Sequence, residues 1–207
     1  MSEPKAVAKK LEEIVPGVYR YKVMDDRIEA ESDAYALVEK GRAVLIDPLP
    51  LAESTLKRLG RVEAIVLSAS CHQRSAWRFR RKLGTKVYAP SGAENLEEEP
   101  DATYRPASRL PGGLGAIHAP GPTDAHYAFR TARGKGVVFC GDLLKNLPGE
   151  GLSFISSEYQ DDPAKTRRSV RKLLDLRFGV LCLSHGAPVL SGVRRALLDL
   201  LRKDRAG

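Results

Sequence analysis

The sequence predicts an α/β fold in which two β-sheets pack face to face and helices cover their outer faces. The first half of the chain is rich in strand-like runs and then alternates strands with helices, and the second half repeats that order. A hydrophobic fraction of 43% and a charged fraction of 29% are typical of globular proteins, which excludes disorder and fibrous repeats. A length of 207 residues fits one domain over residues 1–207.

The first half supplies the elements of one sheet with its helices. Three β-rich runs open it, at residues 17–23, 35–38 and 42–46. An alternating part follows, with a helix at 51–59, a strand at 64–67, a helix at 75–83 and a strand at 86–89. Gly60 and Gly84 end the two helices, because glycine readily adopts the left-handed conformation that closes a helix. Residues 90–111 are polar and lack periodicity, so we expect mostly loop there.

The second half restarts with strands and ends with helices. Its strands are expected at residues 116–118, 126–131 and 136–140, separated by clusters of glycine and proline. Residues 143–159 form an excursion, and a helix at 163–176, a strand at 180–183 and a helix at 191–201 complete the chain. Asp161 or Asp162 is expected to cap the first of these helices, since a proline follows in its first turn.

Charge and cysteine content restrict the setting of the protein. The 34 Lys and Arg minus the 26 Asp and Glu give a net charge of +8, which favours anionic partners but does not by itself indicate nucleic-acid binding. No apolar run reaches the roughly 20 residues that a membrane helix needs, and no signal-peptide core is present, so we expect a cytoplasmic protein without membrane contact. Three cysteines, Cys71, Cys140 and Cys182, fit reduced thiols.

Four segments, read in order, carry a family resemblance. They are Ala-Val-Leu-Ile-Asp-Pro at 43–48, Ile-Val-Leu-Ser-Ala-Ser-Cys-His-Gln-Arg at 65–74, His-Ala-Pro-Gly-Pro-Thr at 118–123, and Phe-Cys-Gly-Asp at 139–142 paired with Leu-Ser-His-Gly at 183–186. Together they resemble the metallo-β-lactamase superfamily. The resemblance implies a four-layer αββα sandwich, with a metal site on loops along one edge of the paired sheets and hydrolysis by two metal ions.

The metal-binding motifs of that family are mostly lost from this chain. Position by position, family ligands are replaced by Ala69, Cys71, Gln73, Arg74 and Pro122. Asp142 and His185 keep their identity, and His72 matches a family histidine only if the register is shifted by one residue. A two-metal site needs about twice the three protein ligands of a single catalytic zinc. The resemblance therefore implies an eroded metal centre with Asp142 and His185 as its remaining ligands.

The first functional prediction is a pseudoenzyme that binds a small anionic ligand or a partner and holds no cofactor. His72, Gln73, Arg74 and Arg78 are the candidate ligand-binding residues. The amino end of the helix at 75–83 offers free N–H groups there, and the arginines add positive charge. Arg74 is also expected to form an ion pair with Asp142 in place of the metal, because a carboxylate at the edge of the core needs a cation.

Three alternatives stay open. A hydrolase of esters, thioesters or phosphodiesters would use one Zn, Mn or Fe ion held by Asp142, His185 and either Cys71 or His72. A metal-free thiol enzyme would use Cys71 as nucleophile with His185 as base and Asp142 to orient it. A nucleic-acid-binding protein would use the basic helix faces around Arg78 and Arg81. His118 and His126 are interpreted as structural.

Overall fold

The computed structural model describes residues 3–206, and its first sheet has seven strands in chain order. They are β1 Glu12–Val15, β2 Val18–Asp25, β3 Ala30–Glu39, β4 Arg42–Ile46, β5 Arg61–Val66, β6 Lys86–Pro90 and β7 Ala102–Tyr104. Strands β1 to β4 pair antiparallel, whereas β4 to β7 pair parallel. The change to parallel pairing occurs where longer crossovers begin, since parallel strands cannot be joined by a tight turn: helices connect β4 to β5 and β5 to β6, and a loop connects β6 to β7.

The second sheet has five strands in the order β14-β11-β10-β9-β8. They are β8 Arg109–Leu110, β9 Leu114–His118, β10 Tyr127–Thr131, β11 Val137–Phe139 and β14 Val180–Cys182. The β11 and β14 strands pair parallel, and a helix lies between them in the chain. A separate hairpin is formed by β12 Leu144–Leu147 and β13 Gly151–Phe154.

Among the described residues, three α-helices and four short 3₁₀ turns lie between these strands in the chain, and a fourth α-helix follows the last strand. The helices are α1 Glu53–Arg58, α2 Ala76–Leu83, α3 Pro163–Leu173 and α4 Val193–Ala206. The 3₁₀ turns are η1 Ser70–His72, η2 Pro111–Gly113, η3 Gly141–Leu143 and η4 Ser157–Tyr159. Asp162 caps α3 by accepting a hydrogen bond of 2.8 Å from the Lys165 N–H, which decides between the two expected caps. No helix among the described residues is long and apolar enough to cross a membrane.

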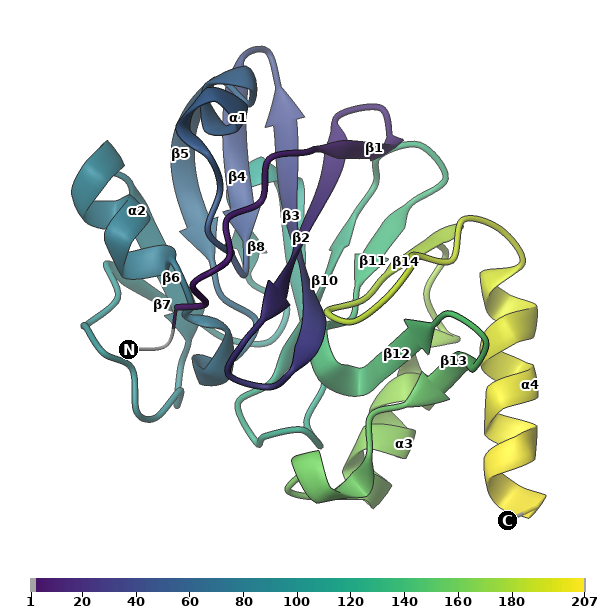
Figure 1. The fold of residues 1–207 in the computed structure, drawn as a ribbon. Coiled ribbons are helices and arrows are strands. Elements are labelled where there is room, and N and C mark those ends of the chain that lie inside the picture. The colour runs from purple at the N-terminus through teal and green to yellow at the C-terminus, as the bar shows by residue number, and fades with distance from the viewer. Residues whose placement is uncertain (1–2, 207) are drawn as a thin grey trace.

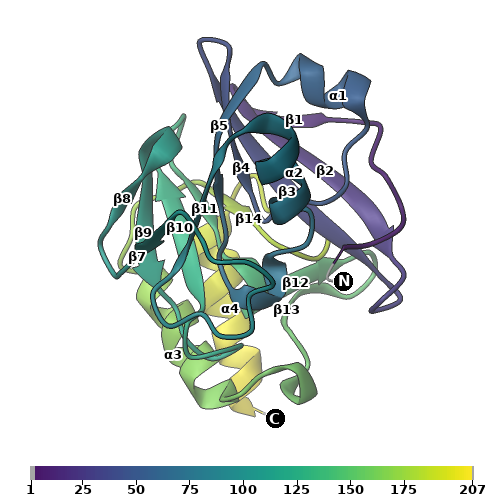
Figure 2. The same ribbon diagram turned by 90° about the vertical axis from the view of Figure 1, so that its left-hand side faces the viewer.

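The hydrophobic core has three parts, which define four layers (Figures 1 and 2). One part joins the first sheet to α1 and α2 through side chains such as Leu56 and Phe79. The central part lies between the two sheets, where Tyr35 and Phe139 pack edge to face with ring centroids 5.1 Å apart. The third joins the second sheet to α3 and α4. This arrangement confirms the predicted α/β class with two facing sheets and outer helices.

The main differences from the expected elements lie at sheet edges and at the start of strand β3. Residues 90–111, expected mostly as loop, contain β7 and β8, which are short edge strands of the two sheets. The β1 strand was not expected, and β3 extends well beyond the expected 35–38. Edge strands of two to four residues have too few alternating positions to show a period-two pattern. Their pairing comes from the neighbouring strand, which a local pattern cannot reveal.

The parallel strands set the position of the candidate site. The β4 and β5 strands of the first sheet run parallel, as do β11 and β14 of the second. Their carboxyl ends lead into the segments that contain Asp47, His72, Asp142 and His185, respectively. Side chains that follow neighbouring parallel strands gather at one edge of a sheet. Four segments far apart in the sequence therefore meet at one edge of the sandwich.

Candidate functional site

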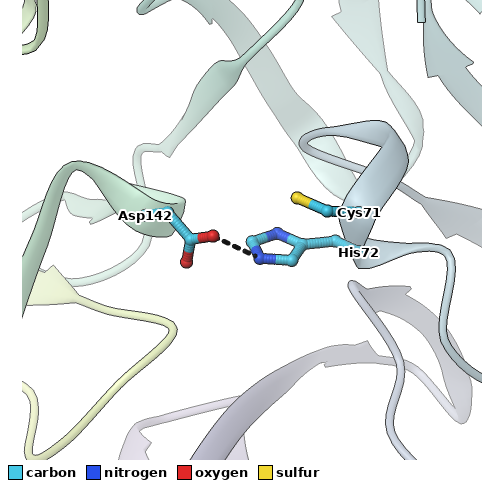
Figure 3. Close-up of side chains that lie close together, drawn as sticks. All are labelled: Cys71, His72 and Asp142. Carbon is cyan, nitrogen blue, oxygen red and sulfur yellow. Dashed lines mark hydrogen bonds and ion pairs between the residues drawn. The ribbon is translucent and has the colours of Figure 1, made fainter. Parts of the chain in front are cut away.

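Two short helical turns bring Cys71, His72 and Asp142 together. The η1 turn follows β5 and carries Cys71 and His72, and the η3 turn follows β11 and carries Asp142. The Cys71 sulfur, a His72 ring nitrogen and an Asp142 carboxylate oxygen all lie within 4.8 Å of one another. Figure 3 shows the His72 ring pointing at the Asp142 carboxylate, with Cys71 on the same turn. These are three side chains of metal-ligating type.

His72 lies between two carboxylates and is almost fully buried. Its Nε2 is 3.0 Å from Oδ2 of Asp142, and its Nδ1 is 3.1 Å from Oδ2 of Asp47. Ser68 completes this arrangement, because its N–H and hydroxyl donate to the two oxygens of Asp47 at 2.7 and 2.6 Å. A doubly protonated ring can donate one hydrogen bond to each carboxylate.

The charges in this cluster support one another. Burial disfavours a charged imidazole, but the Asp142 and Asp47 carboxylates outweigh it and hold the pKa of His72 well above its usual value. Burial likewise opposes ionisation of Asp142, yet the charge and hydrogen bond of His72 hold the pKa of that carboxyl well below its usual range. Without a metal ion, the cluster therefore consists of a His72 imidazolium between two carboxylates.

His185 approaches Asp142 from the loop after β14. Its Nδ1 is 2.9 Å from the Glu31 carbonyl oxygen, and because a carbonyl only accepts, Nδ1 carries the proton. Its Nε2 then faces Asp142, 3.5 Å from Oδ1. That oxygen is buried and accepts no hydrogen bond from the described residues. Both His72 and His185 therefore direct Nε2 towards Asp142, and each has Nδ1 held by another oxygen.

His126 supports the site from within the core. Its Nδ1–H donates to the Ala119 carbonyl at 2.8 Å, and its Nε2 accepts from the Asp142 N–H at 3.2 Å. With one nitrogen donating and the other accepting, the ring is neutral. Burial lowers the pKa of His126 to about 4, which agrees with this assignment. His126 thus fixes the backbone of η3 and is not free to ligate through Nε2.

The neutral His126 predicts a loss of stability in mild acid. In the unfolded chain His126 binds a proton below about pH 6.5, whereas the buried ring in the folded protein binds one only near pH 4. The stabilisation of the folded state that comes from the neutral ring is therefore complete above pH 6.5 and declines as the pH falls towards 4. We expect the free energy of unfolding of a His126→Gln variant to fall less than that of the wild type between pH 7 and pH 5, by about 1 to 2 kcal/mol. Urea unfolding at the two pH values measures this difference. Parallel pH dependences of the two proteins would contradict the assignment.

Cys71 lies beside His72 on the exposed side of the site. Desolvation raises the pKa of its thiol, and the negative charge of Asp142 acts in the same direction against the attraction of His72. A thiol that resists ionisation is a weak nucleophile until a metal ion binds it. The imidazole next to it is His72 rather than the His185 expected as base, and both nitrogens of His72 already face carboxylates. The geometry therefore gives little support to the thiol-enzyme alternative.

Arg74 does not take the role expected of it. The side chain is buried, and its guanidinium donates to the backbone carbonyls of Asp33 at 3.1 Å and Asp47 at 3.3 Å. Arg74 has a φ of +35°, a backbone conformation that side chains rarely adopt. The cationic partner found beside Asp142 is His72. The expected pair of Arg74 with Asp142 is thus replaced by a His72 pair, and Arg74 links the ends of two strands instead.

The anion site expected at the amino end of α2 is filled by the chain itself. The Glu3 carboxylate accepts hydrogen bonds from the Ser75 hydroxyl at 2.6 Å and from Arg78 Nε at 2.8 Å. Gln73, the other expected ligand residue, instead holds neighbouring structure: its side chain accepts from the Trp77 indole and the Glu97 N–H, both at 2.7 Å. The features that suggested an external anion therefore serve internal contacts.

The basic face of α2 is neutralised in the same way. Arg80 pairs with Asp101 at 3.0 Å, and both Arg80 and Arg81 contact Glu98. Lys82 pairs with Glu53 at 3.2 Å. A nucleic-acid groove needs cations that are available to phosphates. These ion pairs offset part of the positive charge that had suggested such a groove.

Three residues support the site without being candidate ligands: the resemblance implied that Asp47 steadies the metal loop, His126 was expected to be structural, and Ser68 was not given a role. Asp47 and Ser68 hold His72, and His126 holds the backbone of Asp142. Asp47 directly follows strand β4, and Ser68 stands two positions after the last residue of β5. Their place after the carboxyl ends of parallel strands was the sequence signal that could have indicated a part in the site. His118, expected to be structural, is exposed and contacts the Asp124 carbonyl at 2.8 Å.

The chain resembles known proteins in sequence over one segment and in fold over nearly its whole length. Residues 108–185 match the family model described as the metallo-beta-lactamase superfamily. The DIM-1 metallo-beta-lactamase superposes with a TM-score of 0.77 at 16% identity, covering 96% of this chain and 99% of that one. A metallo-beta-lactamase family protein from Thermus thermophilus superposes with a TM-score of 0.71 at 20% identity, covering 93% of this chain and 81% of that one. The metallo-beta-lactamase from Hirschia baltica superposes with a TM-score of 0.72 at 12% identity, covering 95% of this chain and 97% of that one. No curated protein sequence matches the chain.

Proposed function

We propose that this chain, which belongs to the metallo-β-lactamase superfamily by its fold and by the match over residues 108–185, is a hydrolase that uses one metal ion. Asp142, His72 and His185 would hold the ion, with Cys71 beside them. The observation that carries the proposal is the shared orientation of the two histidines. Each has Nδ1 bonded to an oxygen acceptor and Nε2 directed at the Asp142 carboxylate.

This orientation is typical of metal-ligating histidines. Such a histidine almost always donates its second ring N–H to a carboxylate or a carbonyl, which fixes the tautomer and the ring position. Asp47 provides the carboxylate for His72, and the Glu31 carbonyl does the same for His185. The buried Oδ1 of Asp142 has no hydrogen bond among the described residues and is available as a further ligand atom.

The donor set suits one borderline divalent ion such as zinc. Imidazole nitrogen, carboxylate oxygen and thiolate are its usual ligands. Nε2 of His185 lies 3.5 Å from Oδ1 of Asp142, so these two atoms would be among those that hold the ion. A second ion would need about three more ligands. The described residues around this cluster include no second group of metal-ligating side chains.

The protein side chains have defined tasks in such a site. A bound divalent ion of this kind lowers the pKa of a coordinated water and polarises a carbonyl or phosphoryl oxygen. Asp47 and Ser68 keep His72 in position, and His126 fixes the backbone that presents Asp142. His72 must give up its Nε2 proton before it can act as a ligand, so metal binding would release a proton to solution.

A second candidate is the metal-free pseudoenzyme. The observation that favours it is the pair of hydrogen bonds at 3.0 and 3.1 Å, which allow a His72 imidazolium to neutralise both carboxylates without an ion. The fold and the cluster are compatible with both states, because a proton and a metal ion compete for the same nitrogen.

Zinc titration of the purified protein separates the two candidates. We expect about one zinc per chain, measured by elemental analysis and by calorimetry in two buffers of different ionisation enthalpy, which report the released proton. An Asp142→Asn, His185→Ala double variant should lose the zinc. His118→Ala, which removes an exposed histidine outside the cluster, should keep it. The zinc-loaded protein should then hydrolyse a nitrophenyl ester, a thioester or a bis-nitrophenyl phosphate, and the double variant should not.

Two results would contradict the proposal. Absence of zinc from the wild type at micromolar concentrations would favour the metal-free pseudoenzyme. Zinc binding that survives in the double variant would show that the ion lies elsewhere on the chain.

A further inference from the structure

The loop that carries His185 is held by one projecting end of strand β3. The β4 strand pairs with β3 only from Tyr35 to Glu39, so residues 30–34 extend past it and leave one backbone edge without a strand partner. The loop after β14 occupies this edge. Asp33 N–H donates to the Ser184 carbonyl at 2.8 Å, and the Glu31 carbonyl accepts from His185.

Asp33 adds a side-chain contact that fixes the loop further. Its Oδ2 accepts the Gly186 N–H at 2.7 Å, directly after His185. Its Oδ1 accepts from Arg20 Nε at 2.7 Å, and both side chains are almost fully buried. A buried carboxylate is tolerated only when it is paired and hydrogen-bonded, and here Arg20 supplies the charge. The Gly186 N–H is therefore held by an ionised acceptor, which makes a stronger bond than a neutral one.

The same residue also contacts the loop that carries His72. The Asp33 carbonyl accepts from Arg74 at 3.1 Å, and Arg74 lies two residues after His72. Arg74 donates as well to the carbonyl of Asp47, whose carboxylate holds His72. Asp33 thus bonds to both histidine-bearing loops, through its carboxylate and N–H to one and through its carbonyl to the other.

We infer that Asp33, neutralised by Arg20, is a positioning residue that fixes the His185 loop so that the imidazole keeps its proton on Nδ1 and directs Nε2 at Asp142. Asp33 acts through its bonds to Gly186 and Ser184 and is not a member of the cluster of Cys71, His72 and Asp142. The consequence for metal affinity rests on the proposed function, whereas the consequence for His185 does not.

The tautomer of His185 in the metal-free protein is the direct test. Nitrogen NMR of ¹⁵N-histidine-labelled protein, assigned with a His185→Gln variant, reports which ring nitrogen carries the proton. We expect the Nδ1–H form in the wild type and, in Asp33→Ala, the tautomer mixture of a histidine in water. Asp33→Asn keeps an oxygen that can accept the Gly186 N–H and should restore the Nδ1–H form. Asp101→Ala is the matched control, because Asp101 also accepts from one arginine and one backbone N–H, at 3.0 and 2.9 Å.

A companion variant covers the case in which Asp33→Ala does not fold. Removing Asp33 leaves Arg20 buried without its strongest partner, which is costly. The Arg20→Met, Asp33→Ala double variant removes that charge as well and is expected to fold, with the same change in the His185 signal. An unchanged Nδ1–H signal in either folded variant overturns the inference.

Zinc affinity provides the second arm of the experiment. Changes to groups that orient metal ligands typically cost 10- to 100-fold in affinity, and we expect a loss of about that size in Asp33→Ala and little change in Asp101→Ala. If the wild type binds no zinc, the proposed function fails, but the NMR arm still decides whether Asp33 positions His185. If the tautomer of His185 changes in Asp33→Ala but zinc affinity equals that of the wild type, then Asp33 positions His185. In that case His185 does not contribute to zinc binding, and the proposed ligand set is wrong.

Discussion

Replacing His72 with alanine is expected to lower the free energy of unfolding by about 3 to 5 kcal/mol, the typical cost of breaking a buried ion pair from one side. His72 is the cation shared by the buried Asp47 carboxylate, at 3.1 Å, and the partly buried Asp142 carboxylate, at 3.0 Å. Its removal leaves two negative charges close together without the cation that lies between them. Urea unfolding in the presence of a chelator, followed by the fluorescence of the single tryptophan Trp77, measures the loss without a metal contribution.

The pH dependence of this effect has a defined sign. The folded pKa of His72 is raised above its usual 6.5, so the stabilisation is complete below pH 6.5 and declines as the pH rises towards the folded pKa. The difference between wild type and His72→Ala should therefore shrink from neutral to alkaline pH. A His72→Ala, Asp142→Asn double variant should lose less stability than the sum of the two single variants, because it removes one of the uncompensated charges.

His118→Ala serves as the control, since it removes an exposed histidine outside the cluster and should change the stability by less than about 0.5 kcal/mol. A loss below about 1 kcal/mol in His72→Ala would mean that His72 carries no charge in the folded metal-free protein.

Replacing Gly186 with alanine is the second change expected to have a large effect, with a loss of about 3 kcal/mol or more in the free energy of unfolding. Gly186 has a φ of +96°, which side chains rarely adopt, and an added Cβ would clash with the backbone carbonyl of Asn146. That carbonyl belongs to the β12–β13 hairpin and accepts a hydrogen bond of 3.0 Å from the Ala187 N–H of the loop. The loop and the hairpin would have to separate, and His185 would move with them.

Gly149→Ala isolates the steric part of this effect. Gly149 lies in the turn of the same hairpin with a φ of +81°, and an added Cβ there would meet no atom within 4 Å. The Gly149→Ala variant should lose only about 1 to 2 kcal/mol of the free energy of unfolding, the cost of placing an alanine in a left-handed backbone conformation. Thermal or urea unfolding of the two variants, compared with the wild type, gives the difference. Equal losses in both variants would show that the clash with Asn146 is relieved without cost.

The strands and helices of the layers could be predicted because their signals are local. The parallel strands β4, β5 and β6 and the helices α2 and α3 appear at the expected positions, since apolar runs and capping residues lie within the elements themselves. The edge strands β7 and β8 carry no such signal, because each depends on pairing with a neighbour that is fixed by the fold.

The site could be predicted only in part, because linear alignment does not give side-chain direction. Residues 70–72 form a 3₁₀ turn with about three residues per turn, so neighbouring side chains point about 120° apart. Cys71, the aligned residue, lies on the exposed side, and His72 turns into the core against Asp47 and Asp142. The filling of the α2 amino end by Glu3 depends on a contact across 75 residues, which no local pattern contains.

The projecting end of β3 also has a consequence for how the site forms. Its contacts with the His185 loop join residues about 150 positions apart, at separations of 153 for Asp33 with Gly186 and 154 for Glu31 with His185. Closing such a long loop lowers the conformational entropy of the chain before the stabilising contacts have formed, so contacts between distant residues slow folding. During synthesis the chain must emerge past Gly186 before these bonds can form. The imidazole of His185 therefore reaches its place after His72 and Asp142 have been synthesised, and a chain interrupted before β14 would carry those two residues without it.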